Sequence, residues 1–301
     1  MKTTTMPLED ELGDVLEKAL SRAGVCAEVV AGRAGVPVGR INDAIDYRSE
    51  LTCDELRRIA AALTLNEVGL CALGAGRYPQ PAIAELPFDV WPLPMPHGIG
   101  VANAYLVAER GASRAILFDT GAGIVALDSA WPAQVKQLDA VFLTHVETEH
   151  AGGLCDVVAR FGVEAAFIPR GAIAKCGESM GEGETRRIGA LEITAFTTPV
   201  HAAEHNCYLV QSAADSGTGL LTRDSVDPTG QETRATANTA LLVSGDLLFA
   251  GSVGGAYFCH QQLQSSLRRV LRTVPPSTII APGHGPMTTV ENELRFNPFV
   301  V

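Results

Sequence analysis

The sequence predicts an α/β fold preceded by a small all-α region. Residues 8–73 show helical periodicity and contain no histidine. From Val101 onwards, short apolar runs typical of strands alternate with helical segments, which is the pattern of an α/β architecture. Clusters of histidine and carboxylate side chains follow several of these predicted strands. The chemistry is therefore expected in the second region.

Composition and charge restrict the class of protein. The chain has 301 residues, of which 47% are hydrophobic, enough for one large core and a smaller one. A net charge of −11 argues against a general nucleic-acid or membrane-surface protein. No apolar run approaches the roughly 18 residues of a membrane span, and Met1 to Asp10 lacks the apolar segment of a signal peptide. The seven cysteines are scattered without a C-x-x-C pair, as expected for reduced thiols in a cytoplasmic protein.

Five short helices are predicted in the N-terminal region. Gly residues end the first two helices, Pro37 suits the first turn of the third, and polar caps begin the last two. The predicted helices are Leu8 to Gly24, Ala27 to Ala34, Val38 to Asp46, one capped by Thr52 and Glu55, and one capped by Asn66.

The run A-E-V-V-A-G-R-A-G-V-P-V-G-R-I in this region resembles a helix-turn-helix domain of the Cro/phage-repressor type. The resemblance implies DNA binding through residues 27–46, with Val38 to Asp46 as the recognition helix. Charge opposes this role, because residues 1–76 carry eight Lys/Arg against twelve Asp/Glu, a net charge of −4. The alternative is a helical module that dimerises or covers the active site.

The predicted domains are a helix-turn-helix-like domain over residues 1–76 and a metal domain over residues 97–301. Between them, residues 77–96 contain six prolines and are expected to form an extended, stiff linker. Residues 211–238 are polar and rich in Ser, Thr, Gly and Asp, and are expected to be a surface insertion or hairpin.

A concentration of metal-binding side chains follows one predicted strand. The apolar run Ala140 to Leu143 precedes T-H-V-E-T-E-H, which places four donors within six positions: His145, Glu147, Glu149 and His150. A cation between them would explain this crowding, whereas the alternative is a polar loop with solvated charges.

Three further donors follow predicted strands later in the chain. His201 comes after the strand 191–196, Asp246 after the strand 239–243, and His284 after the strand 278–280. Seven donor side chains are therefore able to converge from four strand ends.

At this point residues 91–301 resemble the metallo-β-lactamase superfamily, whose pattern is H-x-H-x-D-H followed by a His, a bridging Asp and a last His. The F-D-T-G turn containing Asp119 matches the superfamily's early D-T-G, where the Asp orients ligands. The resemblance implies an αββα sandwich of two sheets with two metal ions at one edge.

Carried over by position, the resemblance assigns ligands to each metal ion. One ion would take His145, Glu147 and His201, and the other would take Glu149, His150 and His284. Asp246 would bridge the two ions and act in catalysis with a metal-bound hydroxide.

Two ligands depart from the superfamily pattern. Glu147 replaces a His, and Glu149 replaces an Asp, so the site carries three carboxylates with Asp246. Oxygen-rich sites favour harder ions, so we expect iron in both positions or iron with zinc or manganese, with zinc as the alternative. Glu147 also resembles the H-x-E-x-D-H pattern of flavodiiron proteins.

The back half resembles glyoxalase II-type hydrolases through G-D-L-L-F-A-G-S-V-G-G and P-G-H-G-P-M-T-T-V-E-N-E-L-R-F-N-P-F. Gly255 stands where that family has an Arg, and Tyr257 stands at its next acidic position, so the substrate wall differs. His205, Tyr257 and His260 are candidates to line the pocket, the alternative for the histidines being hydrogen-bonded non-ligands.

The predicted function is a dinuclear metal-dependent hydrolase acting on a small ester or thioester. The alternative is a diiron protein that binds or reduces O2 or NO, acting as a redox sensor or transcriptional regulator through the helix-turn-helix domain. The expected partner is a small-molecule substrate, and the sequence leaves open whether the protein is a homodimer.

Overall fold

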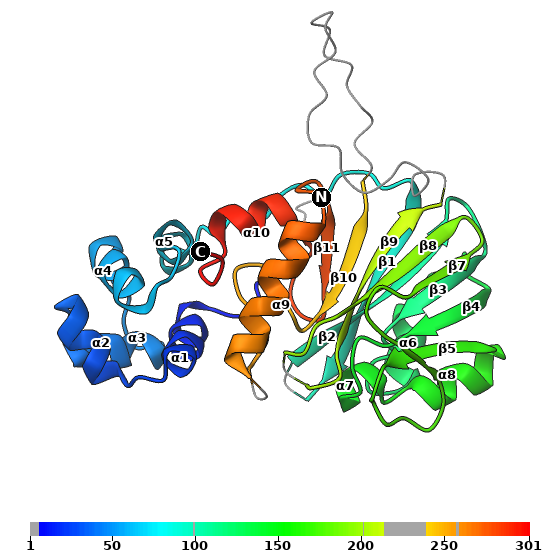
Figure 1. Cartoon of the computed structure of the whole chain (residues 1–301), viewed down its shortest axis with the longest axis horizontal. Coiled ribbons are helices and arrows are strands. Elements are labelled where there is room, and N and C mark those ends of the chain that lie inside the picture. Colours follow the sequence, from blue (N-terminus) through cyan, green and yellow to red (C-terminus); the bar gives the residue numbers. More distant parts are fainter. Residues whose placement is uncertain (1–5, 99, 201, 214–238, 257–258) are drawn as a thin grey trace, which may run out of the picture.

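The computed structural model is a sandwich of two sheets, with five N-terminal helices beside it (Figure 1). The structure describes residues 6–98, 100–200, 202–213, 239–256 and 259–301. The two sheets confirm the predicted mixed α/β architecture. Among the helices described, none is long and apolar enough to cross a membrane.

The first sheet has six strands in the order β1-β2-β3-β4-β5-β6. They are β1 (Phe88–His97), β2 (Gly100–Glu109), β3 (Arg114–Phe118), β4 (Gln137–Phe142), β5 (Ala165–Pro169) and β6 (Glu178–Met180). The outer face is covered by α6 (Ile124–Ala130) and α8 (Leu154–Phe161), whose apolar residues share a core cluster with β3 and β4. Short α7 (Thr148–Ala151) lies between β4 and α8 in the chain.

Strand β1 occupies the second half of the segment expected to be a linker. Residues 88–97 are extended as expected, and they pair with β2 along their whole length, so they form a strand of the first sheet. β1 is an edge strand, where proline is tolerated because its missing N–H can face away from the neighbouring strand. Pro92, Pro94 and Pro96 alternate with the buried Leu93 and Met95, so the prolines all lie on one side of the pleat.

The second sheet also has six strands, in the order β12-β11-β10-β9-β8-β7. They are β7 (Thr185–Ile188), β8 (Leu191–Thr197), β9 (Asn206–Ser212), β10 (Leu241–Gly245), β11 (Ile279–Pro282) and β12 (Thr288–Thr289). The outer face is covered by α9 (His260–Thr273) and α10 (Val290–Phe296). Residues 214–238, most of the predicted insertion, lie outside the described residues.

The space between the sheets is an apolar core that includes packed aromatic rings. Phe118, Phe142 and Tyr208 come from three strands of both sheets, and their ring centroids lie 5.3 to 5.8 Å apart. This packing fixes the strand ends relative to each other, and the functional side chains follow those ends.

The N-terminal helices agree closely with the predicted caps. They are α1 (Leu12–Ala23), α2 (Ala27–Ala34), α3 (Val38–Ile45), α4 (Cys53–Leu63) and α5 (Glu67–Gly74). Thr52 and Glu55 form the expected capping box, and Asn66 accepts hydrogen bonds from two backbone N–H groups of α5. The first helix begins at Leu12, later than predicted, because Glu11 is its N-cap.

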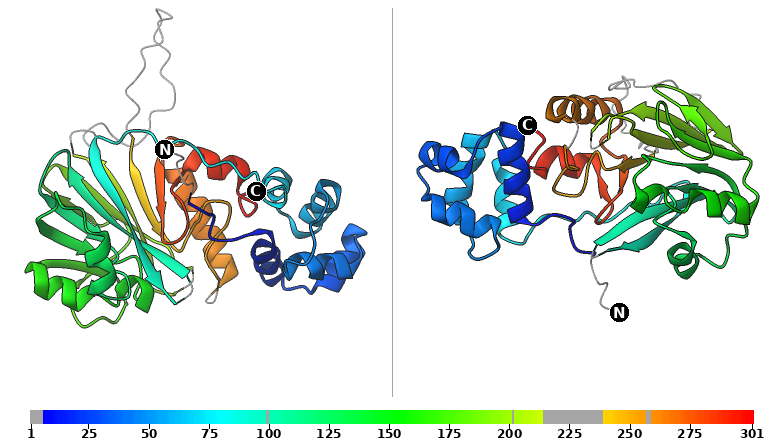
Figure 2. Two further views of the ribbon diagram at one scale, coloured as in Figure 1. Left: turned by 180° about the vertical axis from the view of Figure 1, so that it is seen from behind. Right: turned by 90° about the horizontal axis from the view of Figure 1, so that it is seen from below.

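These helices share one apolar cluster with the sandwich. Buried residues of α1 to α5 and of α9, α10 and the second sheet form a continuous cluster. Figure 2 shows α9 and α10 between the sheets and the five helices. Gly69 of α5 lies directly against the backbone of Phe296, and the Asn66 N–H donates to Pro298 O at 2.9 Å. The predicted division into domains therefore does not coincide with a break in the core.

Candidate metal centre

The residues after β4 deliver the first histidines. β4 ends at Phe142, and the fully buried His145 follows in a short loop. Glu147 is the N-cap of α7, which carries Glu149 and the fully buried His150. A strand that ends in a loop and one helical turn thus places two imidazoles at the sheet edge.

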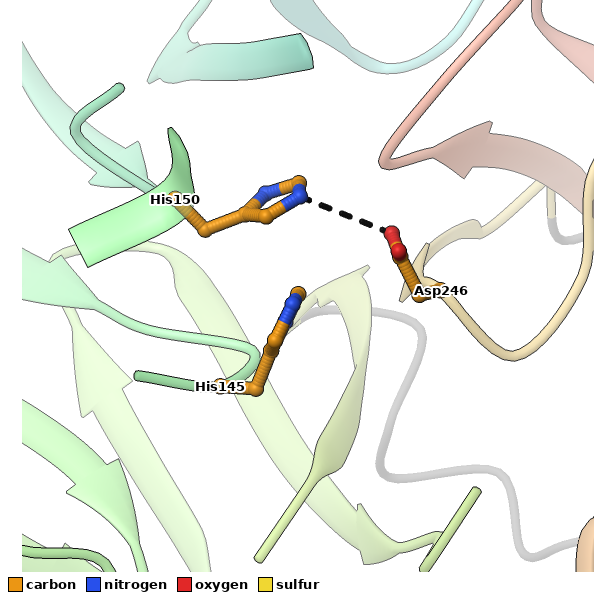
Figure 3. Close-up of side chains that lie close together, drawn as sticks. All are labelled: His145, His150 and Asp246. Atoms are coloured by element: carbon orange, nitrogen blue, oxygen red, sulfur yellow. Dashed lines mark ion pairs between the residues drawn. The ribbon is translucent and has the colours of Figure 1, made fainter. Parts of the chain in front are cut away.

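Three donors from this loop and from the end of β10 form a compact group. Among the described residues, the donor atoms of His145, His150 and Asp246 lie within 4.8 Å of one another, and all three side chains are buried. His150 Nε2 lies 3.6 Å from Asp246 Oδ1. Figure 3 shows the His145 and His150 imidazoles next to each other, with the His150 ring directed at the Asp246 carboxylate. These three residues therefore converge from different strand ends, as expected.

His284 approaches the same group from the end of β11. Its Nε2 lies 3.3 Å from His150 Nε2 and 3.7 Å from Asp246 Oδ2. Two imidazole nitrogens at this distance require a proton or another cation between them, because two lone pairs would repel each other. The arrangement fits a metal ion in place of that proton.

Hydrogen bonds set which nitrogen of each imidazole faces the group. Thr144 Oγ1 donates to Asp119 and so accepts from His145 Nδ1 at 3.0 Å. His284 Nδ1 donates to Val101 O at 3.0 Å. In both residues Nε2 is left to face the cluster, which is the support that metal-binding imidazoles need.

Asp119 orients the site as the resemblance implies. Its Oδ1 accepts the Thr144 N–H at 2.7 Å, and its Oδ2 lies 3.2 Å from His150 Nδ1. The residue is only 2% exposed and has a φ of 56°, in the left-handed region that is uncommon outside glycine. This turn aims one carboxylate at both the loop backbone and His150.

His205 positions Asp246 through a hydrogen bond to its backbone. It is fully buried, and its Nε2 accepts the backbone N–H of Asp246 at 3.1 Å. Its Nδ1 lies 2.8 Å from Thr198 Oγ1. The nitrogen that would face a metal therefore accepts a hydrogen bond, in agreement with the hydrogen-bonded alternative.

The remaining predicted residues lie outside the compact group. Glu147 and Glu149 are half-buried, and the Glu149 Oε2 atom lies 3.9 Å from His97 Nε2. His260 begins α9, and its Nε2 lies 3.2 Å from Ser21 Oγ, so it faces α1. His201 and Tyr257 lie outside the described residues.

The charges of the group support each other. Burial alone would raise the pKa of Asp246, but the surrounding histidines, His150 above all, hold it well below its ordinary value. Burial alone would lower the pKa of His150, but the carboxylates of Asp246 and Asp119 raise it to about 9. The site therefore favours an ionised carboxylate and a positive charge beside it, a charge that a metal ion can supply.

Glycines that the ligand pattern does not include allow Asp246 to fit. A Cβ on Gly283 would lie 2.3 Å from Asp246 Oδ1, and one on Gly254 would lie 1.9 Å from Asp246 O. Gly245 has a φ of 48°, and a Cβ there would meet His205 and Thr144. In the sequence, these close approaches are indicated by the glycines of the G-D and P-G-H motifs, because glycine beside a ligand lets the backbone come close to it.

The fold and this cluster define a two-sheet α/β protein with a candidate metal site at the sheet edge. Residues 97–200 match the Metallo-beta-lactamase superfamily. The chain therefore contains a metallo-beta-lactamase superfamily domain. The matched range does not include the five N-terminal helices, whose helix-turn-helix assignment stays a prediction.

Two curated proteins are similar to parts of this chain. The probable metallo-hydrolase YqgX of Bacillus subtilis is 26% identical over 229 residues, which are 68% of this chain and 95% of that protein. A hydroxyacylglutathione hydrolase of Acidiphilium cryptum is 32% identical over 141 residues, 44% of this chain and 53% of that protein.

Solved structures show the same fold. The BLEG-1 B3 metallo-beta-lactamase has a TM-score of 0.53 at 22% identity and covers 71% of this chain and 100% of its own. ETHE1 from Myxococcus xanthus has a TM-score of 0.51 at 24% identity and covers 65% of this chain and 78% of its own.

Proposed function

We propose that the protein is a dinuclear metal-dependent hydrolase of a small ester or thioester. The observation that carries the proposal is the buried Asp246, whose Oδ1 accepts no hydrogen bond from the described residues. Burying a carboxylate oxygen that accepts no hydrogen bond lowers the stability of the fold unless a cation binds that oxygen. The similarity to a metallo-hydrolase and to a hydroxyacylglutathione hydrolase supports hydrolysis as the reaction.

The converging side chains of His145, His150, Asp246 and His284 are the residues that would hold the proposed divalent ions. Bound there, such ions would lower the pKa of a water molecule and polarise a substrate carbonyl. Asp246 offers its carboxylate between the imidazoles of His150 and His284. His205 fixes the backbone of Asp246, and Asp119 orients His150, so the ligands keep their positions before substrate arrives.

The test of this function is hydrolysis by metal-loaded protein. We expect cleavage of at least one substrate in a panel of small esters, thioesters and lactones, and loss of that activity in Asp246→Asn. Asp139→Asn is the matched control, because Asp139 lies on β4 and pairs with Arg114 at the protein surface. A metal-loaded protein that cleaves none of the panel would contradict the proposal.

We propose that the native metal is iron, alone or with zinc or manganese. Glu147 stands where the superfamily pattern has an imidazole, and as a ligand it would add a carboxylate oxygen, a donor that favours harder ions. Glu147→His should therefore shift occupancy toward zinc, measured by elemental analysis of protein grown with both metals. Glu164→His is the control, because Glu164 is exposed in the loop before β5.

The same experiment separates the two candidate functions. Two zinc ions in wild-type protein grown with iron available would remove the iron proposal and leave the hydrolase. An iron-loaded protein would make the diiron alternative testable, because a ferrous form that senses O2 or NO must change its absorption spectrum on exposure.

We propose that the five helices cover the metal domain and do not read DNA. Arg40 of the predicted recognition helix and Arg48, just beyond it, are both engaged within the protein. Arg40 forms two hydrogen bonds to the Glu55 carboxylate, and Arg48 pairs with Asp43 and Asp46. Phosphate binding would have to break these pairs, in a region whose net charge is already negative.

A further inference from the structure

Two cysteines from different helices meet in the helical region. Cys53 is the first residue of α4, Cys71 lies in α5, and their Sγ atoms are 2.6 Å apart. A disulfide bond measures about 2.05 Å, so the two sulfurs need only a small approach to bond. Cys53 is exposed and Cys71 is partly exposed, so a small oxidant can reach the pair.

The surroundings give the two thiols different roles. Cys53 follows the N-cap Thr52, at the end of α4 where backbone N–H groups favour a negative charge. Burial and the neighbouring Cys53 together raise the pKa of Cys71 to about 12, although Arg57 opposes the shift. Cys53 is therefore the thiol placed to react first, and Cys71 is the thiol placed to resolve the product.

We infer that Cys53 and Cys71 are a redox modification site, which a peroxide converts into a reversible disulfide. The Cys53 thiolate attacks a peroxide oxygen, so the O–O bond breaks and Cys53 becomes a sulfenic acid as water leaves. The Cys71 sulfur then attacks the Cys53 sulfur, forming the S–S bond and releasing a second water. Two thiols lose two electrons and two protons, and hydrogen peroxide takes up both.

The bond would tie α4 to α5, the helix that packs against α10 and the C-terminal segment. α4 and α5 contribute to the shared apolar cluster, and α5 contacts the C-terminal segment through Gly69 and Asn66. Cross-linking Cys53 to Cys71 would therefore fix the part of the helical region that is docked on the metal domain.

A second pair of thiols provides an internal comparison. Cys155 of α8 and Cys176, before β6, have their Sγ atoms 3.7 Å apart. This separation is longer than that of Cys53 and Cys71, so we expect the Cys53–Cys71 bond to form at lower peroxide exposure.

The experiment treats reduced full-length protein with hydrogen peroxide and maps the products. We expect the free thiols to fall from seven to five and the mass to fall by two hydrogen atoms, both restored by a reductant. Trypsin digestion without reductant should join the peptide Ser49 to Arg57 to the peptide Ile59 to Arg77. Cys71→Ser should accumulate a Cys53 sulfenic acid that a dimedone reagent traps, because the resolving thiol is missing.

Cys26→Ser is the matched control, because Cys26 is an exposed cysteine of the same region that is not in the pair. It should still form the joined peptides. Separate, unoxidised Cys53 and Cys71 peptides at exposures that oxidise other cysteines would overturn the inference. So would oxidation of Cys53 to sulfinic acid in wild-type protein without a cross-link.

Discussion

Gly283→Ala is expected to remove metal binding while the protein still folds. The new Cβ would lie 2.3 Å from Asp246 Oδ1 and 3.0 Å from His150 Cε1, so both ligands must move. Backbone on the other side limits the escape, because the Cβ would also lie 3.1 Å from Gly245 C. Mutating a residue that only hydrogen-bonds to a metal ligand typically lowers metal affinity about 10- to 100-fold. Because Gly283→Ala displaces the ligands themselves, we expect a loss of affinity of at least that size. Isothermal titration with zinc or ferrous iron measures it.

Gly123→Ala is the control for this experiment. Gly123 has an extended φ of 171° before α6, and a Cβ there would meet nothing within 4 Å. It should bind metal like the wild type. If Gly283→Ala also bound metal like the wild type, with an unchanged unfolding midpoint, then Asp246 and His150 would not be the ligands that this geometry indicates.

The elements were predictable where the signal is local. The helices α2 and α4 and the cap at Asn66 follow from residues within a few positions of each helix end. The strands before His145 and His284 follow from apolar runs. The alternation of these elements was enough to predict an α/β fold.

The edge strand β1 was not predictable in the same way. Its prolines indicate an extended linker when only the local sequence is considered. Whether the missing N–H of Pro92 or Pro94 matters depends on which side β2 lies, and that is a property of the assembled sheet. The buried Leu93 and Met95, alternating with the prolines, were the available signal.

The roles of individual histidines also depend on contacts distant in sequence. His145 and His205 are both buried histidines near Asp246, and sequence alone does not show which nitrogen each presents. His205 Nε2 is used by the Asp246 N–H, which comes from a different part of the chain. The tautomer, and therefore the ability to bind metal, is set by that non-local hydrogen bond.

Gly69→Ala is expected to destabilise the protein by about 3 kcal/mol, because it overpacks the contact between the helical region and the sandwich. A Cβ on Gly69 would lie 1.6 Å from Phe296 O, a backbone atom that cannot rotate away. Moving α5 away would also break the Asn66 N–H bond to Pro298 O and the Asn66 Nδ2 bond to Arg295 O, each 2.9 Å long. Urea unfolding followed by circular dichroism measures the free energy of unfolding.

Gly32→Ala, at another glycine of the helical region, is expected to have the opposite effect on stability. Gly32 lies within α2 with nothing within 4 Å of an added Cβ, so alanine should stabilise the protein by up to about 1 kcal/mol. If the helices were an independent domain, Gly69→Ala would leave the sandwich's unfolding transition unchanged. Because one apolar cluster includes residues of α1 to α5, of α9 and α10 and of the second sheet, we expect one transition that shifts as a whole.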